Sequence, residues 1–275
     1  MTIGKGAFRY RVDDRWAHQD ASARGVLSSV ACDRRGRVYV CSREPDPKIL
    51  VYDADGARLD EWTHAACRHP AGIHGISVAA DDTLFVTDVL DHVVHRFTLD
   101  GTLLGTLGTA GRPGAPGQPF NSPTQAFQAP SGDLYVADGY GQARIHRFAA
   151  DGTLLASWGE PGGGPGQFDT PHSIGVDRRG QVWVADRENC RVQVFDADGG
   201  FIRERRLERA NNIALDGHDR VFAGSGILDL DGTVLAESID YWGHCVCVAP
   251  NGDLYWTHVG GPNQLAKYIR VGERQ

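Results

Sequence analysis

Short runs of alternating apolar and polar residues, separated by turn residues, recur along most of the chain. The clearest copies are HGISVAADDTLFVTDVLDHVVHRFTLDGTLLGTLG from His74, TQAFQAPSGDLYVADGYGQARIHRFAADGTLLASWG from Thr124 and HSIGVDRRGQVWVADRENCRVQVFDADGGF from His172. Alternation with a period of two residues between turns predicts β-strands. No stretch shows the pattern of a long amphipathic helix, so we expect an all-β protein.

The copies also recur in weaker form near Val26, Ala210 and Gly243. Six copies of roughly 45 residues each match the repeat length of a four-stranded propeller blade. We therefore predict that residues 1–275 form a single six-bladed β-propeller domain.

The two ends of the chain predict how the ring closes. The last copy ends near Arg270 after three strands, whereas Phe8, Tyr10 and Val12 near the start alternate with arginines. A closed ring leaves no long sheet edge exposed. We expect the N-terminal strand to complete the last blade as its outer strand.

Composition narrows the class of partner. The chain has 35 Gly, 13 Pro and a net charge of −7, and it has no run of Lys or Arg. These features disfavour nucleic acid and anionic membranes as partners. The chain shows neither a signal-like apolar segment nor a stretch long enough to span a bilayer. We expect a soluble, cytoplasmic protein whose six cysteines are free, mostly buried thiols.

Histidine occupies one repeat position in every second blade. Aligning the copies on the end of their second strand places these residues in one register: Ser28, His74, Thr124, His172, Asn211 and His244. This position begins the inner strand, which lines the axial channel of a propeller. Three imidazoles around an axis match a zinc site with an open fourth position. The alternative is that they are unrelated channel or core histidines.

Three further side chains are expected on the same rim as these histidines. Arg43 and Arg187 directly follow the second strands of blades one and four, and Tyr140 lies one residue further along in blade three. Two guanidinium groups beside a metal attract and orient a carboxylate, and a phenol at that place can act as a base. The alternatives are surface ion pairs for the arginines and a turn cap for the tyrosine. We interpret His92, His95 and His146 as surface or packing residues.

The copies resemble NHL repeats, and several segments are similar to peptidyl-α-hydroxyglycine α-amidating lyases. The resemblance runs from about Val26 to His258 and is most specific in IHGISV with VTDVLDHVV, FNSPTQ with VADGYGQARI, and GQFDTPHSIGV with VADRENCRVQVF. It implies zinc ligands at His74, His172 and His244. It also implies that Tyr140 is the catalytic base and that Arg43 and Arg187 orient the substrate.

The chain departs from the family at two kinds of position. Cys245 stands where the family has an Asp that helps to bind a structural calcium, which disfavours calcium here, although backbone carbonyls near Val30 and Ile76 remain available. The family's disulfide cysteines are missing or displaced, which suits a reducing compartment. The sequence shows neither a secretory signal nor the family's companion hydroxylating domain, so we expect a small substrate rather than a hormone-like peptide.

The sequence favours a zinc-dependent carbon–nitrogen lyase that cleaves an N-acyl or N-carbamoyl α-hydroxyglycine-type substrate to an amide and glyoxylate. Ligation by nitrogen alone is also compatible with Fe²⁺ or Mn²⁺. The alternatives are a metal-dependent hydrolase or other lyase that acts on a small hydroxy acid, and a non-catalytic NHL recognition scaffold. The amide portion of the substrate and the oligomeric state stay open.

Overall fold

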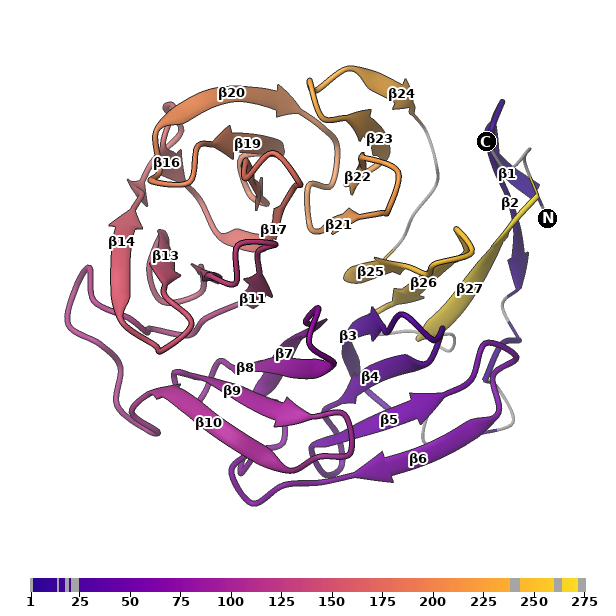
Figure 1. The fold of residues 1–275 in the computed structure, drawn as a ribbon, viewed down its shortest axis with the longest axis horizontal. Helices are drawn as coiled ribbons and strands as arrows, with labels where there is room; N and C mark the ends of the chain where they lie inside the picture. Colours follow the sequence, from indigo (N-terminus) through magenta and orange to yellow (C-terminus); the bar gives the residue numbers. More distant parts are fainter. Residues whose placement is uncertain are drawn as a thin grey trace.

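Six β-sheets stand side by side in a ring around a central axis, as Figure 1 shows face-on. The structure is a computed structural model, and it describes residues 2–13, 15–17, 20, 25–237, 243–259 and 264–271. None of these residues forms a helix with the length and apolar character that crossing a membrane requires. The predicted all-β, six-bladed propeller is confirmed.

Each of the first three blades is a four-stranded antiparallel meander. Blade one contains β3 (Leu27–Cys32), β4 (Val38–Ser42), β5 (Lys48–Tyr52) and β6 (Arg58–Trp62). Blade two contains β7 (Ile73–Val78), β8 (Thr83–Asp88), β9 (Val93–Thr98) and β10 (Leu103–Gly108). Blade three contains β11 (Gln125–Gln128), β12 (Leu134–Asp138), β13 (Arg144–Phe148) and β14 (Leu154–Trp158).

The remaining blades follow the same plan. A short parallel pair, β15 (Glu160–Pro161) and β16 (Gln167–Phe168), leads into blade four. Blade four contains β17 (Pro171–Val176), β18 (Val182–Asp186), β19 (Arg191–Phe195) and β20 (Phe201–Arg206). Blade five contains β21 (Ile213–Leu215), β22 (Arg220–Ala223), β23 (Gly226–Asp229) and β24 (Val234–Ala236). In every blade the first strand lies nearest the axis.

The N-terminal segment closes the ring in blade six. This sheet contains β25 (Cys245–Val248), β26 (Leu254–Thr257), β27 (Leu265–Arg270), β2 (Phe8–Asp13) and β1 (Thr2–Lys5). Pairing of β2 with β27 confirms the predicted closure. Strand β1 was not predicted, because its Gly4 weakens the strand pattern. That glycine has φ +83°, and an added Cβ would lie 1.9 Å from the carbonyl oxygen of Phe8.

Aspartates shape the tight turns between inner and second strands. Asp33, Asp177 and Asp216 each accept hydrogen bonds from the backbone N–H groups two and four residues further along, at 2.8–3.0 Å. Such turns reverse the chain within four residues. All inner strands therefore run in one direction, and their first residues gather at one end of the axial channel.

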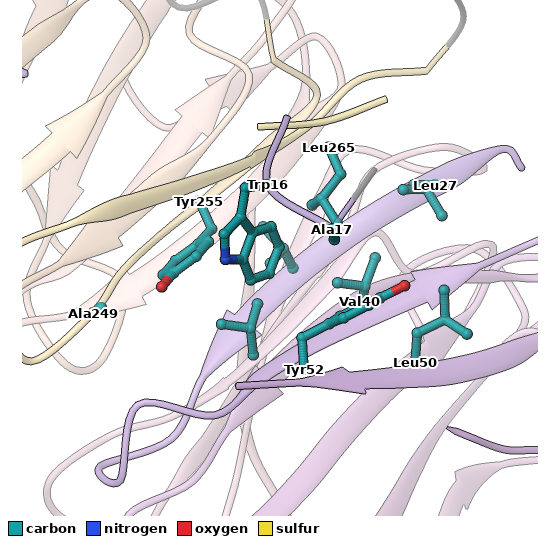
Figure 2. Packing of buried hydrophobic residues seen from close by; sticks show 11 residues of the cluster. Trp16, Ala17, Leu27, Val40, Leu50, Tyr52, Ala249, Tyr255 and Leu265 are labelled. Atoms are coloured by element: carbon teal, nitrogen blue, oxygen red, sulfur yellow. The ribbon is translucent and has the colours of Figure 1, made fainter. Parts of the chain in front are cut away.

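An aromatic wedge fills the junction between blades one and six (Figure 2). The Trp16 ring lies 5.4 Å from that of Tyr52 in blade one and 4.7 Å from that of Tyr255 in blade six. Its indole N–H donates to the carbonyl of Ala54 at 3.0 Å. Trp16 is only 3% exposed. Trp16, which lies between β2 of blade six and β3 of blade one, thus packs into the core between these blades.

Candidate metal centre

The three histidines singled out by the register meet on the propeller axis. One ring nitrogen of each lies within 4.8 Å of the others, the one such three-residue group of His, Cys, Asp or Glu among the described residues. The ring centroids are 4.7–5.0 Å apart, and the rings are nearly perpendicular to one another. His74 and His172 are buried, and His244 is partly buried. Blades two, four and six therefore deliver three imidazoles to one point.

Each histidine is oriented by the blade that follows it around the ring. The Nδ1 atoms of His74, His172 and His244 lie 2.8, 2.6 and 2.6 Å from the backbone carbonyl oxygens of Thr124, Asn211 and Ser28, respectively. A carbonyl only accepts, so each Nδ1 carries the hydrogen and each Nε2 carries a lone pair. The three acceptors occupy the histidine register in the intervening blades, a relation that the repeat alignment already contained.

Burial keeps these rings neutral. Desolvation, followed by the nearby His244, lowers the pKa of His74 and of His172 well below the usual value. Desolvation also lowers the pKa of His244 to about 4, against a hydrogen bond to Ser28 that raises it. At neutral pH all three Nε2 atoms are thus free of protons, which metal ligation requires.

Tyr140 lies across this group from the loop after β12. Its phenol oxygen is 2.9 Å from Nε2 of His74 and 3.1 Å from Nε2 of His172, and the side chain is 41% exposed. One hydroxyl proton serves only one of these lone pairs, so the other faces an oxygen without a donor. A cation among the three Nε2 atoms relieves this mismatch. The donor set, three neutral nitrogens with one side open, fits Zn²⁺, Fe²⁺ or Mn²⁺.

Arg187 joins the group through the tyrosine. Its guanidinium donates to the phenol oxygen of Tyr140 at 3.3 Å and lies 5.4 Å from the centre of that ring. Its Nε donates to Glu188 at 2.7 Å. The structure therefore places a positive charge directly beside the phenol oxygen, as expected for a residue at the end of β18.

Arg43 approaches from blade one. Its guanidinium donates to the carbonyl of Ala71, while its buried Nε has no hydrogen-bond partner among the described residues. Arg43 and Arg187 both lie close enough to His74 and His244 to lower the pKa values of those imidazoles further. The structure thus brings all six predicted residues to one end of the channel and makes that end electropositive.

Cys245 lies just below the histidines, at the position where the resembled family has an acidic residue. Its thiol lies 3.1 Å from the hydroxyl of Ser29 and 3.8 Å from the carbonyl of Val30. One of the carbonyls considered for calcium therefore faces a thiol.

The other histidines noted in the sequence take packing roles. Nδ1 of His95 lies 2.9 Å from the hydroxyl of Thr106, and Nδ1 of His146 lies 2.7 Å from that of Ser157. His92 accepts from the backbone of Ser122 at 3.0 Å.

A segment that includes the first three strands of blade four matches a known repeat family. The NHL repeat family matches residues 168–195, which span the start of that blade through β19. The chain thus contains an NHL repeat within a six-bladed β-propeller. It also resembles proteins named as amidating lyases over 46–54% of its length.

Three relatives illustrate the sequence similarity. Human NHL repeat-containing protein 3 is 37% identical over 201 residues, 70% of this chain and 58% of that protein. Mouse peptidyl-glycine alpha-amidating monooxygenase is 40% identical over 141 residues, 48% of this chain and 14% of that protein. A probable peptidyl-alpha-hydroxyglycine alpha-amidating lyase of Caenorhabditis elegans is 37% identical over 153 residues, 54% and 43% of the two chains. The chain thus spans less than two thirds of the length of each of these relatives.

Solved structures share the architecture at low identity. A streptogramin B lyase superposes with a TM-score of 0.67 at 13% identity, over 96% of this chain and 99% of that chain. A gluconolactonase from Xanthomonas campestris gives a TM-score of 0.68 at 16% identity, over 96% and 91%. At such identity the likeness shows the fold alone.

Proposed function

We propose that this NHL propeller is a metal-dependent lyase that cleaves the C–N bond of an N-acyl or N-carbamoyl α-hydroxyglycine-type substrate, releasing an amide and glyoxylate. The observation that carries the proposal is the convergence of three proton-free Nε2 atoms beneath the Tyr140 phenol. Its similarity to relatives named as amidating lyases supports the reaction class.

His74, His172 and His244 are the residues that would hold the metal, with zinc as our first choice and Fe²⁺ or Mn²⁺ as alternatives. A divalent ion supplies Lewis acidity, which makes a substrate hydroxyl a better proton donor. The Nδ1 hydrogen bonds to the neighbouring blades fix the rings in the tautomer and orientation that ligation needs.

Tyr140 is the proposed base. Removing the proton from the α-hydroxyl allows a carbonyl to form at that carbon while the electron pair of the C–N bond leaves with nitrogen. The leaving nitrogen then takes up the proton, so the products are an amide and an aldehyde acid. Arg187, which donates to the phenol oxygen, stabilises the negative charge that a tyrosine base carries.

Arg43 and Arg187 are the proposed carboxylate-binding residues. They enter from blades one and four, and both influence the histidines electrostatically. Within the part of the chain that the structure describes, the buried Nε of Arg43 has no hydrogen-bond partner, and a carboxylate that reached it would supply one. Two-point binding of the carboxylate restricts the substrate to poses in which its hydroxyl faces Tyr140.

We further propose a small-molecule substrate and a cytoplasmic location. All six cysteines are free thiols, a state that a reducing compartment maintains. Cys41 is buried and Cys190 is exposed, while the other four are partly buried, so the expectation of mostly buried thiols is too strong.

The test combines metal analysis with a direct product assay. Protein purified without added metal is expected to contain about one divalent ion per chain and to release glyoxylate and benzamide in equal amounts from N-benzoyl-α-hydroxyglycine. A chelator should stop turnover, and the identified metal should restore it. Bound metal without glyoxylate release would favour a different metal-dependent hydrolase or lyase. A stable, metal-free protein would favour a recognition scaffold.

A further inference from the structure

A pair of cysteines lies between blades one and six, toward the end of the inner strands opposite the histidines. Cys32 ends β3 in blade one, and Cys247 lies in β25 of blade six. Their sulfur atoms are 2.9 Å apart although the residues are 215 positions apart in the sequence. A disulfide bond measures 2.03–2.05 Å, so roughly 1 Å of movement brings the two sulfurs to bonding distance.

Strand geometry separates this pair from the metal centre. Cys32 lies four residues beyond Ser28, the register position equivalent to the histidines, and a strand advances about 3.3 Å per residue. The thiols therefore lie about 10–13 Å along the channel from the histidine rings. No group in the proposed reaction contacts them.

Cys32 borders a cavity at this far end of the inner strands. Cys32 lines a cavity of about 340 Å³ between blades one, five and six, together with Arg34, His218 and Val248. As residues, Cys32 and Cys247 are both partly buried, whereas Cys41 in the second strand of blade one is fully buried.

The two thiols differ in their surroundings. Burial, followed by its contact with Cys32, raises the pKa of Cys247 well above the usual value. Cys247 therefore stays protonated at neutral pH, and Cys32, which borders the cavity, is the thiol placed to meet an oxidant first.

We propose that Cys32 and Cys247 form an oxidative modification site, a reversible disulfide that joins the first and last blades, with hydroperoxides as the class of oxidant. Sulfur of Cys32 attacks the peroxide oxygen, the O–O bond breaks, and a sulfenic acid and one water form. Sulfur of Cys247 then displaces the hydroxyl as a second water. Two thiols lose two protons and two electrons, and one hydrogen peroxide becomes two waters.

The disulfide would strengthen the closure of the ring. The sulfurs pack against the same cluster as Trp16 and Tyr255, which fills the junction between blades one and six. A bond across 215 residues removes many conformations from the unfolded chain.

The test oxidises the full chain and locates the bond. Reduced protein is treated with hydrogen peroxide, remaining thiols are blocked with N-ethylmaleimide, and the protein is digested without reductant. Two fewer blocked thiols per chain, a peptide pair that contains Cys32 and Cys247, and reversal by dithiothreitol are expected. The melting temperature should rise by about 5 °C or more on oxidation.

Variants assign the pair, because Cys245 and Cys247 lie on one tryptic peptide. Cys32→Ser and Cys247→Ser should abolish the cross-link, while Cys245→Ser and Cys190→Ser should retain it. Fragmentation of the cross-linked peptide between Cys245 and Cys247 locates the bond in the oxidised wild-type protein, even where a variant folds poorly. Retention of all thiols, sulfinic acid without a cross-link, or a bond to Cys245 overturns the proposal.

Discussion

The two ends of the axial channel use the same inner strands in different ways. At the histidine end, defined by His74, His172 and His244, equivalent positions of alternate blades converge with near-threefold symmetry. At the thiol end, defined by Cys32 and Cys247, the contact joins only the two blades between which the ring closes. Repetition thus builds a shared site at one end, while closure builds a local contact at the other.

Removing one imidazole from the histidine end should have the largest effect on metal binding and activity. His172→Ala should reduce bound metal to near zero and lower kcat/KM by about 10³-fold or more, because a metal supplies several kcal/mol of charge stabilisation. Elemental analysis and the glyoxylate assay measure both effects. The exposed His218→Ala is the control. A fully active, metal-free His172 variant would end the proposed mechanism.

Tyr140→Phe separates the base from the ligands at the same end. We expect metal content to be unchanged and kcat to fall by about 10²–10⁴-fold, the usual contribution of a positioned general base. The phenol oxygen of Tyr140 lies within hydrogen-bond distance of two imidazoles, but it is not one of the three proposed metal ligands. Loss of metal in this variant would instead make Tyr140 part of the binding site.

Trp16→Ala tests the packing between blades one and six, the junction at which Cys32 and Cys247 also lie. Truncating this buried ring should lower the free energy of unfolding by about 3–5 kcal/mol, measured by urea denaturation. Metal content and kcat of the folded protein should stay near wild type, since Trp16 lies outside the metal centre. The exposed Leu59→Ala should cost under about 0.5 kcal/mol. Equal losses in both variants would contradict the wedge.

The smallest effect is the pH dependence of the metal-free protein. The pKa of His244 is about 4 in the folded chain and 6.5 ordinarily, so between these values the unfolded chain binds a proton that the folded chain does not. Stability should therefore be fully present above pH 6.5 and fall as the pH approaches 4. Melting curves of wild type and His244→Gln test this.

Burial also lowers the pKa of His95 to about 4 and the pKa values of His74 and His172 well below 6.5, so the informative quantity is the difference between the two proteins. Identical pH profiles would show that His244 titrates normally when folded.

The features that the sequence predicts are mostly those that recur from blade to blade, and the features that it misses occur only once. Six copies with a shared register identify the blades and place three histidines on the axis, since every blade repeats the same local turn and strand pattern. Pairing of Tyr10 and Val12 with β27 follows because the last copy lacks a strand. The residues on the rim follow from the same alignment.

Contacts between the first and last blades occur only once in the ring, so no repeat in the sequence indicates them. The approach of Cys32 to Cys247 and the insertion of Trp16 between Tyr52 and Tyr255 depend on how far the blades curve, which alternation does not encode. Strand β1 was not predicted, because Gly4 interrupts its alternating pattern of apolar and polar residues.

The carbonyl bonds to the histidine rings have a mechanical consequence. Blades two, four and six supply the rings, and blades three, five and one supply the carbonyls that brace them. An ion bound by the three rings would thereby be linked to all six sheets, either through a ligand or through the carbonyl that orients a ligand. Separating two adjacent blades would tilt a ring and weaken its bond to the ion, so a bound metal would make the six blades unfold together rather than one at a time.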